Sequence, residues 1–432
     1  PLGNNLHRVV VFRDGADRAG RVVPFSSFDS ANPEDLWVYL ANYEAKTGGR
    51  VMSIPHNANV SNGQMFATEK FDGKPIDKAY AKTRTRFEPL HEITQMKGDS
   101  ETHPALSPDD VFADYGTWDK ANLTGESAPT EADLPGSYAR SALLRGMALE
   151  ARIGANPFKQ GFIGSTDSHT SLATAGENNF FGKASILEPG PDRWEHVLIK
   201  SQVSDELTTY GYETLAAGLA GVWATENTRE ALFDAMARRE TYATTGPRIT
   251  VRVFGGWDFV EKDVHRADFA EFGYAHGVPM GGELTPAPRG KAPSFVIRAL
   301  RDVDGANLDR IQVVKGWLGP DGQMLEKVYD VALSDGRKPG SDGKVPPVGS
   351  TVDLAGPSFS NTIGDALMFA HWIDPDFNAS TPAFYYVRVI EIPTPTWAAY
   401  DAVIFGVQMP EQVPMIHQER AYTSPVWYTP QG

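Results

Sequence analysis

Two apolar, strand-like runs in this sequence end in residue types that bind metals. Residues 161–170 read GFIGSTDSHT, so Asp167 and His169 follow the first run two positions apart. Side chains two apart on an extended segment point to the same face, which would let Asp167 and His169 bind one metal ion or hold one water. The alternative is a loop in which Ser, Thr and Asp side chains only satisfy backbone groups at a turn.

Residues 50–57 repeat this design. They read RVMSIPHN and place His56 and Asn57 after an apolar run. His56 is a candidate metal ligand, and a core or loop histidine is the alternative. Asn57 can orient a water or a ligand through its side-chain amide. In folds with parallel strands, catalytic residues lie at the carboxyl ends of the strands. We therefore expect these two segments to lie side by side at the same end of the fold.

A third polar segment follows the strand-like run 92–97. Lys97 closes this run and could stabilise an oxyanion, or it could extend its ammonium group into solvent from a strand end. His103 lies in the loop that follows, near Asp99 and Glu101. His103 is a candidate for proton transfer or substrate orientation, and a cluster of solvated charges is the alternative.

Other polar residues have weaker claims to a function. Glu177, in the sequence ENN, follows the Asp167 loop and could line a pocket or only shape it. The remaining histidines have no partner at a suitable spacing, and we interpret them as core or surface residues: His7, His91, His196, His265, His276, His371 and His417.

Composition limits the chemistry and the partners. The chain has no cysteine, so a metal must be held by His, carboxylate or carbonyl groups, as in hydrolytic zinc, manganese, iron or magnesium sites. A net charge of −15 argues against nucleic acid as a partner. No apolar run approaches the ~18 residues of a membrane-spanning helix. Composition fits the bacterial periplasm and cytoplasm equally well.

The order of elements predicts an α/β fold followed by a β-rich part. Up to residue 248, strand-like runs such as 7–12 alternate with helix-like runs such as 33–44 and 138–153, which predicts parallel strands with right-handed crossovers. From residue 249 a period of two dominates, in the runs 249–253, 295–299, 311–313 and 385–389. At 432 residues, two domains are expected, 1–248 and 249–432.

Taken together, these motifs resemble a known family. The segments IPHN (54–57), QMKGDSETHP (95–104) and GSTDSH (164–169) resemble those of the bacterial domain of unknown function 3604 family. That family is similar to the polymerase and histidinol phosphatase (PHP) metallohydrolases. The resemblance covers nearly the whole chain and extends to its closing segment, 421–427.

The resemblance implies a distorted β/α barrel with two or three divalent metals, zinc, manganese or iron, at its strand ends. Asp167 and His169 match the last metal motif and His56 matches a histidine of a middle strand, whereas His103 is a weaker match. The His-x-His strand with which PHP proteins open is missing from this sequence. We therefore interpret the chain as the C-terminal part of the barrel and expect a separate N-terminal fragment to supply the first strands.

The leading functional hypothesis is a metal-dependent hydrolase that uses activated water on a small-molecule ester, most simply a phosphoester. His56, Asp167 and His169 would hold the metals, with His103, Lys97 and Asn57 as catalytic candidates. The alternative is a non-catalytic binding subunit whose β-rich domain recognises a saccharide or a protein surface. That alternative expects exposed aromatic residues such as Trp317, Trp372 and Trp397.

Overall fold

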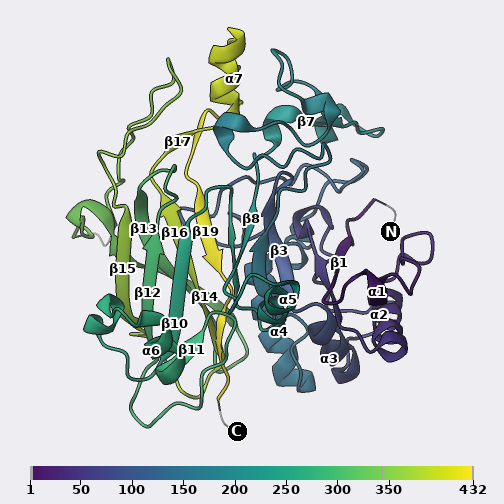
Figure 1. Cartoon of the computed structure of the whole chain (residues 1–432), viewed down its shortest axis with the longest axis vertical. Coiled ribbons are helices and arrows are strands. Elements are labelled where there is room, and N and C mark those ends of the chain that lie inside the picture. The colour runs from purple at the N-terminus through teal and green to yellow at the C-terminus, as the bar shows by residue number, and fades with distance from the viewer. Residues whose placement is uncertain (1–2, 342–343, 431–432) are drawn as a thin grey trace.

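The structure, a computed structural model, describes residues 3–341 and 344–430. It has mixed α/β architecture, with most helices in the N-terminal part and long antiparallel strands in the C-terminal part. Figure 1 shows the strands of the C-terminal part on the left and helices α2, α3 and α4 at the lower right. This arrangement confirms the predicted order of an α/β segment followed by a strand-rich one.

The first five strands form two small sheets. Their bounds are β1 (Arg8–Phe12), β2 (Val51–Pro55), β3 (Leu90–Gln95), β4 (Gly98–Asp99) and β5 (Gly161–Gly164). Strands β3 and β5 pair in parallel through a crossover that contains α4 (Ala139–Ile153), as predicted. Strands β1 and β2 are antiparallel, so the parallel prediction is wrong there. Parallel strands are usually buried on both faces, whereas β1 is an edge strand with Val9 49% exposed.

The described residues form no closed barrel. After β5 the chain makes the short strands β6 (Val197–Ile199) and β7 (Thr209–Tyr210) and then β8 (Leu219–Val222) and β9 (Thr241–Thr244). Strands β8 and β9 pair with each other, and β9 pairs with the C-terminal strand β19 (Arg420–Thr423). One sheet therefore contains strands from both sides of residue 248, and the division into two domains at that residue stays a prediction.

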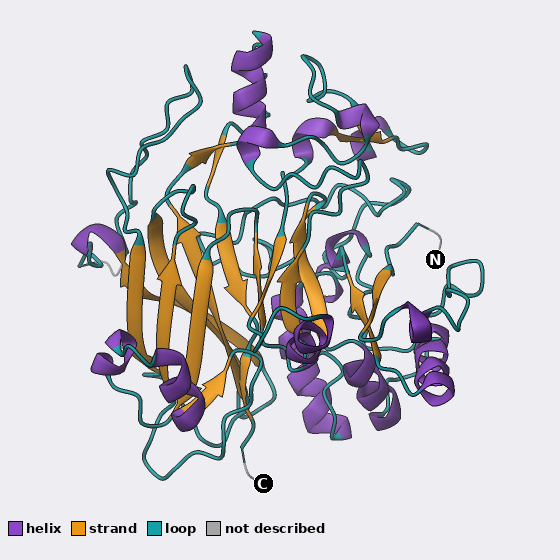
Figure 2. Cartoon of the chain, in the orientation of Figure 1, coloured by secondary structure: helices purple, strands orange, loops and turns teal. Residues whose placement is uncertain are grey.

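The C-terminal part is built from two facing sheets (Figure 2). One has the order β11-β10-β12-β15, and the other has the order β14-β13-β16-β19-β9-β8 with β20 beside β16. The strands not yet given are β10 (Thr250–Gly256), β11 (Gly277–Pro279), β12 (Ser294–Leu300), β13 (Leu308–Leu318), β14 (Met324–Leu333), β15 (Leu367–Ile373), β16 (Ala383–Glu391), β17 (Thr394–Pro395), β18 (Ile416–His417) and β20 (Val426–Tyr428). Alternate residues such as Val253, Ile297 and Val387 fill the core between the sheets, so the period of two marked real strands.

Most helices pack beside one of the sheets, and the last one projects beyond the strands at the top of Figure 1. The helices are α1 (Ala16–Ala19), α2 (Pro33–Thr47), α3 (Lys78–Phe87), α4, α5 (Arg229–Ala237), α6 (Phe269–His276) and α7 (Trp397–Phe405). As predicted, Asn32 caps α2, because its side chain accepts a hydrogen bond from the backbone N–H of Glu34. Helix α4 joins the two parts, since Leu143 and Met147 share one apolar cluster with Phe162 and Tyr386.

The structure changes one expectation about the aromatic residues. Trp397 is 3% exposed, so the prediction that it lies on the surface is wrong. Its indole N–H donates to the carbonyl of Thr214, which anchors the start of α7. Trp317 and Trp372 are half-buried. None of the described helices combines the length and the apolar character that crossing a bilayer requires.

Candidate functional site

The segments after β2, β3 and β5 meet at one place. Gln95, the last residue of β3, donates from Nε2 to Asn57 Oδ1 at 2.6 Å and to Asp167 Oδ2 at 2.8 Å. The ammonium group of Lys97 forms an ion pair with the same oxygen of Asp167. We call the side chains gathered here the strand-end cluster: His56, Asn57, Gln95, Lys97, Asp167, His169 and Lys183.

The carboxylate of Asp167 is the centre of the strand-end cluster. Lys183 Nζ lies 2.5 Å from Asp167 Oδ2 and 2.8 Å from its backbone oxygen. Burial raises the pKa of the Asp167 carboxyl, but the ammonium groups of Lys97 and Lys183 outweigh burial and hold this pKa well below its usual range. Asp167 is therefore ionised at neutral pH, and two cations face one anion.

Backbone conformation aims two of these side chains. Asn57 has φ 54° and Asp167 has φ 53°, the left-handed region that Asn and Asp tolerate better than most residues. Asp167 is therefore not on an extended segment, and that part of the sequence argument was wrong. The turn still brings His169 back, because His169 Nε2 lies 3.3 Å from Asp167 Oδ1. The side chain of His169 is 62% exposed, which leaves it accessible to a ligand.

His56 is a neutral imidazole at the edge of this cluster. Its Nδ1 is buried and has no hydrogen-bond partner. Burial lowers the pKa of His56 to about 4, and the nearby Lys97 contributes, although Asp167 acts in the opposite direction. The ring of His7 packs edge-on at 5.7 Å. A neutral imidazole with a free nitrogen is the form of histidine that binds metals.

Sequence reasoning missed two ionisable residues here. Glu92 lies in the middle of β3 and is 5% exposed; its Oε2 accepts a hydrogen bond from Ser165, and its Oε1 has no partner. Burial raises the pKa of Glu92 to about 7. A glutamate within a strand-like run was a usable signal, because ionisable side chains are rarely buried. Lys183 gave no such signal in the sequence, because it is 16 positions from Asp167 along the chain.

His103 lies apart from these contacts. Its Nδ1 accepts a hydrogen bond from the backbone N–H of Ala105, so Nε2 carries the proton that it donates to Asp119 Oδ2 at 2.9 Å. Both ring nitrogens are thus used in the loop itself. The structure leaves His103 no free ring nitrogen for the catalytic role predicted from the sequence, and substitution of His103 tests that role.

Two of the strand-end residues offer donor atoms that a divalent metal accepts. His56 Nδ1 is an orphaned imidazole nitrogen, and Asp167 is an ionised carboxylate whose Oδ1 has only the 3.3 Å contact with His169. These are nitrogen and oxygen donors of the kind that zinc, manganese and iron accept. Within the described residues, His56, Asp167 and His169 do not bring three ligand atoms within 4.8 Å of one another. Lys97 and Lys183 occupy the other oxygen of Asp167.

Comparison with known proteins supports the resemblance to the domain of unknown function 3604 family. No curated protein and no solved structure matches the chain. A family model described as protein of unknown function (DUF3604) matches residues 1–430. Because this match covers nearly all of the 432 residues, the chain belongs to the DUF3604 family.

Proposed function

We propose that the strand-end cluster is the catalytic site of a metal-dependent hydrolase that acts on an anionic ester, most simply a phosphoester. One observation carries the proposal: the ammonium groups of Lys97 and Lys183, both on side chains 8% exposed, converge on the single carboxylate of Asp167. The three charges sum to one positive charge. A second anion would balance it, and a phosphate group is a suitable one.

Each residue of the cluster has a task in this reaction. His56, Asp167 and His169 would hold a divalent zinc, manganese or iron ion, which polarises an ester oxygen and lowers the pKa of water. Lys97 and Lys183 would neutralise the negative charge that develops on the ester oxygens. Asn57 is held by Gln95 and would orient the water or the ester through its amide.

Glu92 adds a group that can move a proton. A carboxyl with a pKa of about 7 is protonated in part of the molecules at neutral pH, so it can both accept and donate. Its free oxygen, Oε1, is the atom available for this transfer.

The barrel architecture and the separate N-terminal fragment stay predictions. Mass spectrometry of the intact protein tests the fragment, which would appear as a second polypeptide.

Hydrolysis of p-nitrophenyl phosphate and p-nitrophenyl acetate with added Zn²⁺ or Mn²⁺ tests the proposal. We expect metal-dependent hydrolysis of the phosphate ester. Lys183→Met should lower kcat/KM by roughly 100-fold, the scale of losing one group that stabilises developing charge. The matched control is Lys200→Met, which removes an exposed lysine that pairs with Asp205. Hydrolysis that is absent with every metal, or equal in the two variants, would contradict the proposal.

A further inference from the structure

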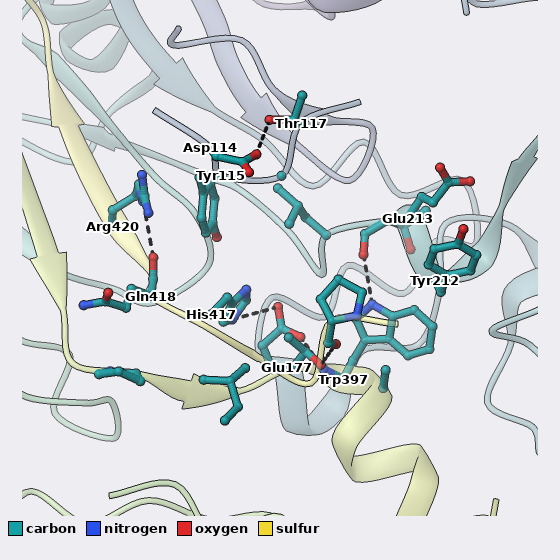
Figure 3. Close-up of a pocket in the computed structure, with 18 of the residues that line it drawn as sticks. Asp114, Tyr115, Thr117, Glu177, Tyr212, Glu213, Trp397, His417, Gln418 and Arg420 are labelled. Atoms are coloured by element: carbon teal, nitrogen blue, oxygen red, sulfur yellow. Dashed lines mark hydrogen bonds and ion pairs between the residues drawn. The ribbon is translucent and has the colours of Figure 1, made fainter. Parts of the chain in front are cut away.

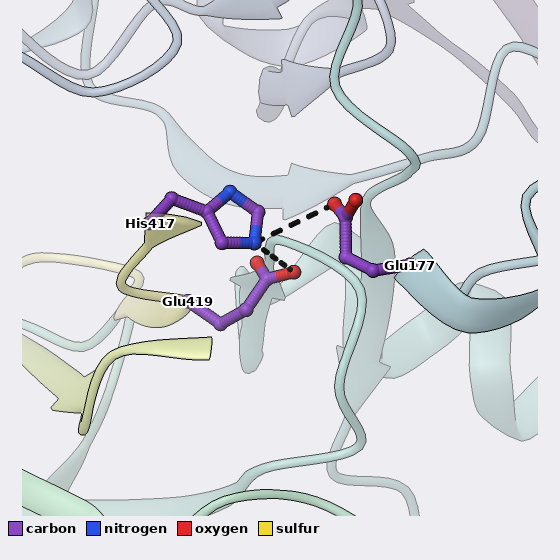
Figure 4. A group of neighbouring side chains, drawn as sticks. All are labelled: Glu177, His417 and Glu419. Carbon is purple, nitrogen blue, oxygen red and sulfur yellow. Dashed lines mark ion pairs between the residues drawn. The ribbon is translucent and has the colours of Figure 1, made fainter. Parts of the chain in front are cut away.

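A second group of ligand-type side chains lies outside the strand-end cluster. Glu177, at the start of the short helix η3 (Glu177–Asn179), meets His417 of β18 and Glu419, which precedes β19. Figure 4 shows the three side chains converging. His417 Nε2 lies 3.2 Å from Glu419 Oε1 and 3.6 Å from Glu177 Oε1. The sequence interpretation of His417 as a histidine without organised partners was therefore wrong.

The two carboxylates are oriented by their second oxygens. Glu177 Oε2 accepts the backbone N–H of Trp397 at 2.5 Å. Glu419 Oε2 accepts the hydroxyl of Tyr115 at 2.9 Å and that of Thr245. The Oε1 atom of each glutamate is left to face His417. Such outer hydrogen bonds fix the direction of ligand oxygens in metal sites.

The imidazole nitrogen between these oxygens makes no hydrogen bond. His417 Nε2 is buried and makes no well-aligned hydrogen bond, although it lies within ion-pair distance of the Oε1 atoms of Glu419 and Glu177. The three ligand atoms all lie within 4.8 Å of one another. The side chains are 5% to 11% exposed. This arrangement is typical of ligands that share an ion.

Charge also favours a cation here. Two buried carboxylates face one imidazole. Burial lowers the pKa of His417, but the charge of the carboxylates outweighs burial and raises this pKa to about 9, so the proton of His417 offsets one of them. A metal ion would take the place of that proton. The nearest guanidinium, that of Arg420, donates to the backbone oxygens of Gln418 and Phe112 and lies 4.0 Å above the ring of Tyr115. Uncompensated buried charge is costly, and a bound cation would remove the cost.

A cavity of about 650 Å³ opens beside the group. Figure 3 shows Glu177 and His417 among its walls, together with Tyr115, Trp397 and Arg420. Glu177 and His417 line this cavity, so a metal held by them and Glu419 would keep an open position toward it, as in sites where water or a small ligand completes the coordination.

We propose that Glu177, His417 and Glu419 bind one divalent transition-metal cation, Zn²⁺ or Mn²⁺, whose open position faces this cavity. One imidazole and two carboxylates match these ions better than Ca²⁺ or Mg²⁺, which prefer oxygen ligands alone. The site shares no residue with the strand-end cluster, so it can be present whether or not that cluster is catalytic.

Metal binding by the full chain tests this site. Metal-free protein is titrated with MnCl₂ or ZnCl₂, and bound metal is counted by elemental mass spectrometry after desalting. We expect His417→Ala and Glu177→Gln each to lose one bound equivalent relative to the unsubstituted chain. His276→Ala, which removes an exposed histidine from α6, should lose none. Glu177→Gln preserves side-chain size and keeps the test decisive where His417→Ala does not fold.

A crystal grown with MnCl₂ locates the ion. We expect an anomalous difference peak among Glu177 Oε1, His417 Nε2 and Glu419 Oε1. Equal metal content in Glu177→Gln and the unsubstituted chain, or no anomalous peak at saturating Mn²⁺, would overturn the proposal. Asp167→Asn in the strand-end cluster should retain this equivalent, so the two proposals can fail separately.

Discussion

Replacing Glu92 with Gln should change how stability depends on pH. Burial raises the pKa of Glu92 from 4.5 in the unfolded chain to about 7 in the folded one. A group whose folded pKa is raised stabilises the fold fully below its unfolded pKa, and this contribution is lost as pH rises through the folded pKa. In the unsubstituted chain the loss therefore occurs between pH 4.5 and 7.

The size of the effect follows from the shift. At about 1.4 kcal/mol for each pKa unit, the rise from 4.5 to about 7 corresponds to about 3 kcal/mol of folding free energy. Gln cannot ionise and does not show this loss. We expect the stability of Glu92→Gln relative to the unsubstituted chain to increase by about 3 kcal/mol between pH 4 and pH 8.

Reversible urea unfolding at a series of pH values, followed by tryptophan fluorescence, measures this difference. The matched control is Glu206→Gln, an exposed glutamate, whose stability difference should vary little with pH. If the difference for Glu92→Gln is the same at pH 4 and pH 8, Glu92 ionises normally in the folded chain. That result would also remove Glu92 from the proposed proton transfer.

Three further substitutions test other parts of the structure. Arg140→Met removes one of the two buried guanidinium groups that pair with Glu101 and Asp110, and Arg388 is left alone with both carboxylates. This change should destabilise by roughly 3–5 kcal/mol in urea unfolding, against about 0.5 kcal/mol for the exposed Arg238→Met; equal losses would refute this. Asn32→Ala removes the cap of α2 and should lower stability by about 1 kcal/mol. An unchanged midpoint of urea unfolding would mean that the cap does not stabilise the protein. His103→Gln should leave kcat for ester hydrolysis unchanged, because both ring nitrogens bond within the loop; a large fall in kcat would make His103 catalytic.

Local patterns in the sequence predicted several of the longer elements. Helix α2 was predictable because its cap and its first-turn proline act within a few residues. Strands such as β12 and β16 were predictable because alternate residues face the core between two sheets. The antiparallel pairing of β1 with β2 was not, since an edge strand has no strong burial pattern to fix its direction.

The candidate sites were predictable only in part. Residues directly after strands, such as Asn57 and Lys97, could be found because strand ends gather at one edge. Lys183 and His417 could not, because a long loop and the C-terminal strands bring them to Asp167 and Glu177 through tertiary contacts alone. A histidine without a nearby partner in the sequence was therefore no evidence against a site.

The most direct test of the proposed hydrolase is the metal content of Asp167→Ala and His169→Ala, measured beside their hydrolysis of p-nitrophenyl phosphate. We expect each variant to lose bound metal and turnover together while the C-terminal sheets stay folded, because each loses a ligand of the strand-end cluster. The metal equivalent bound by Glu177, His417 and Glu419 should remain in both variants. Unchanged metal content and unchanged turnover in both variants would contradict the assignment of Asp167 and His169 as metal ligands, and with it the proposed function.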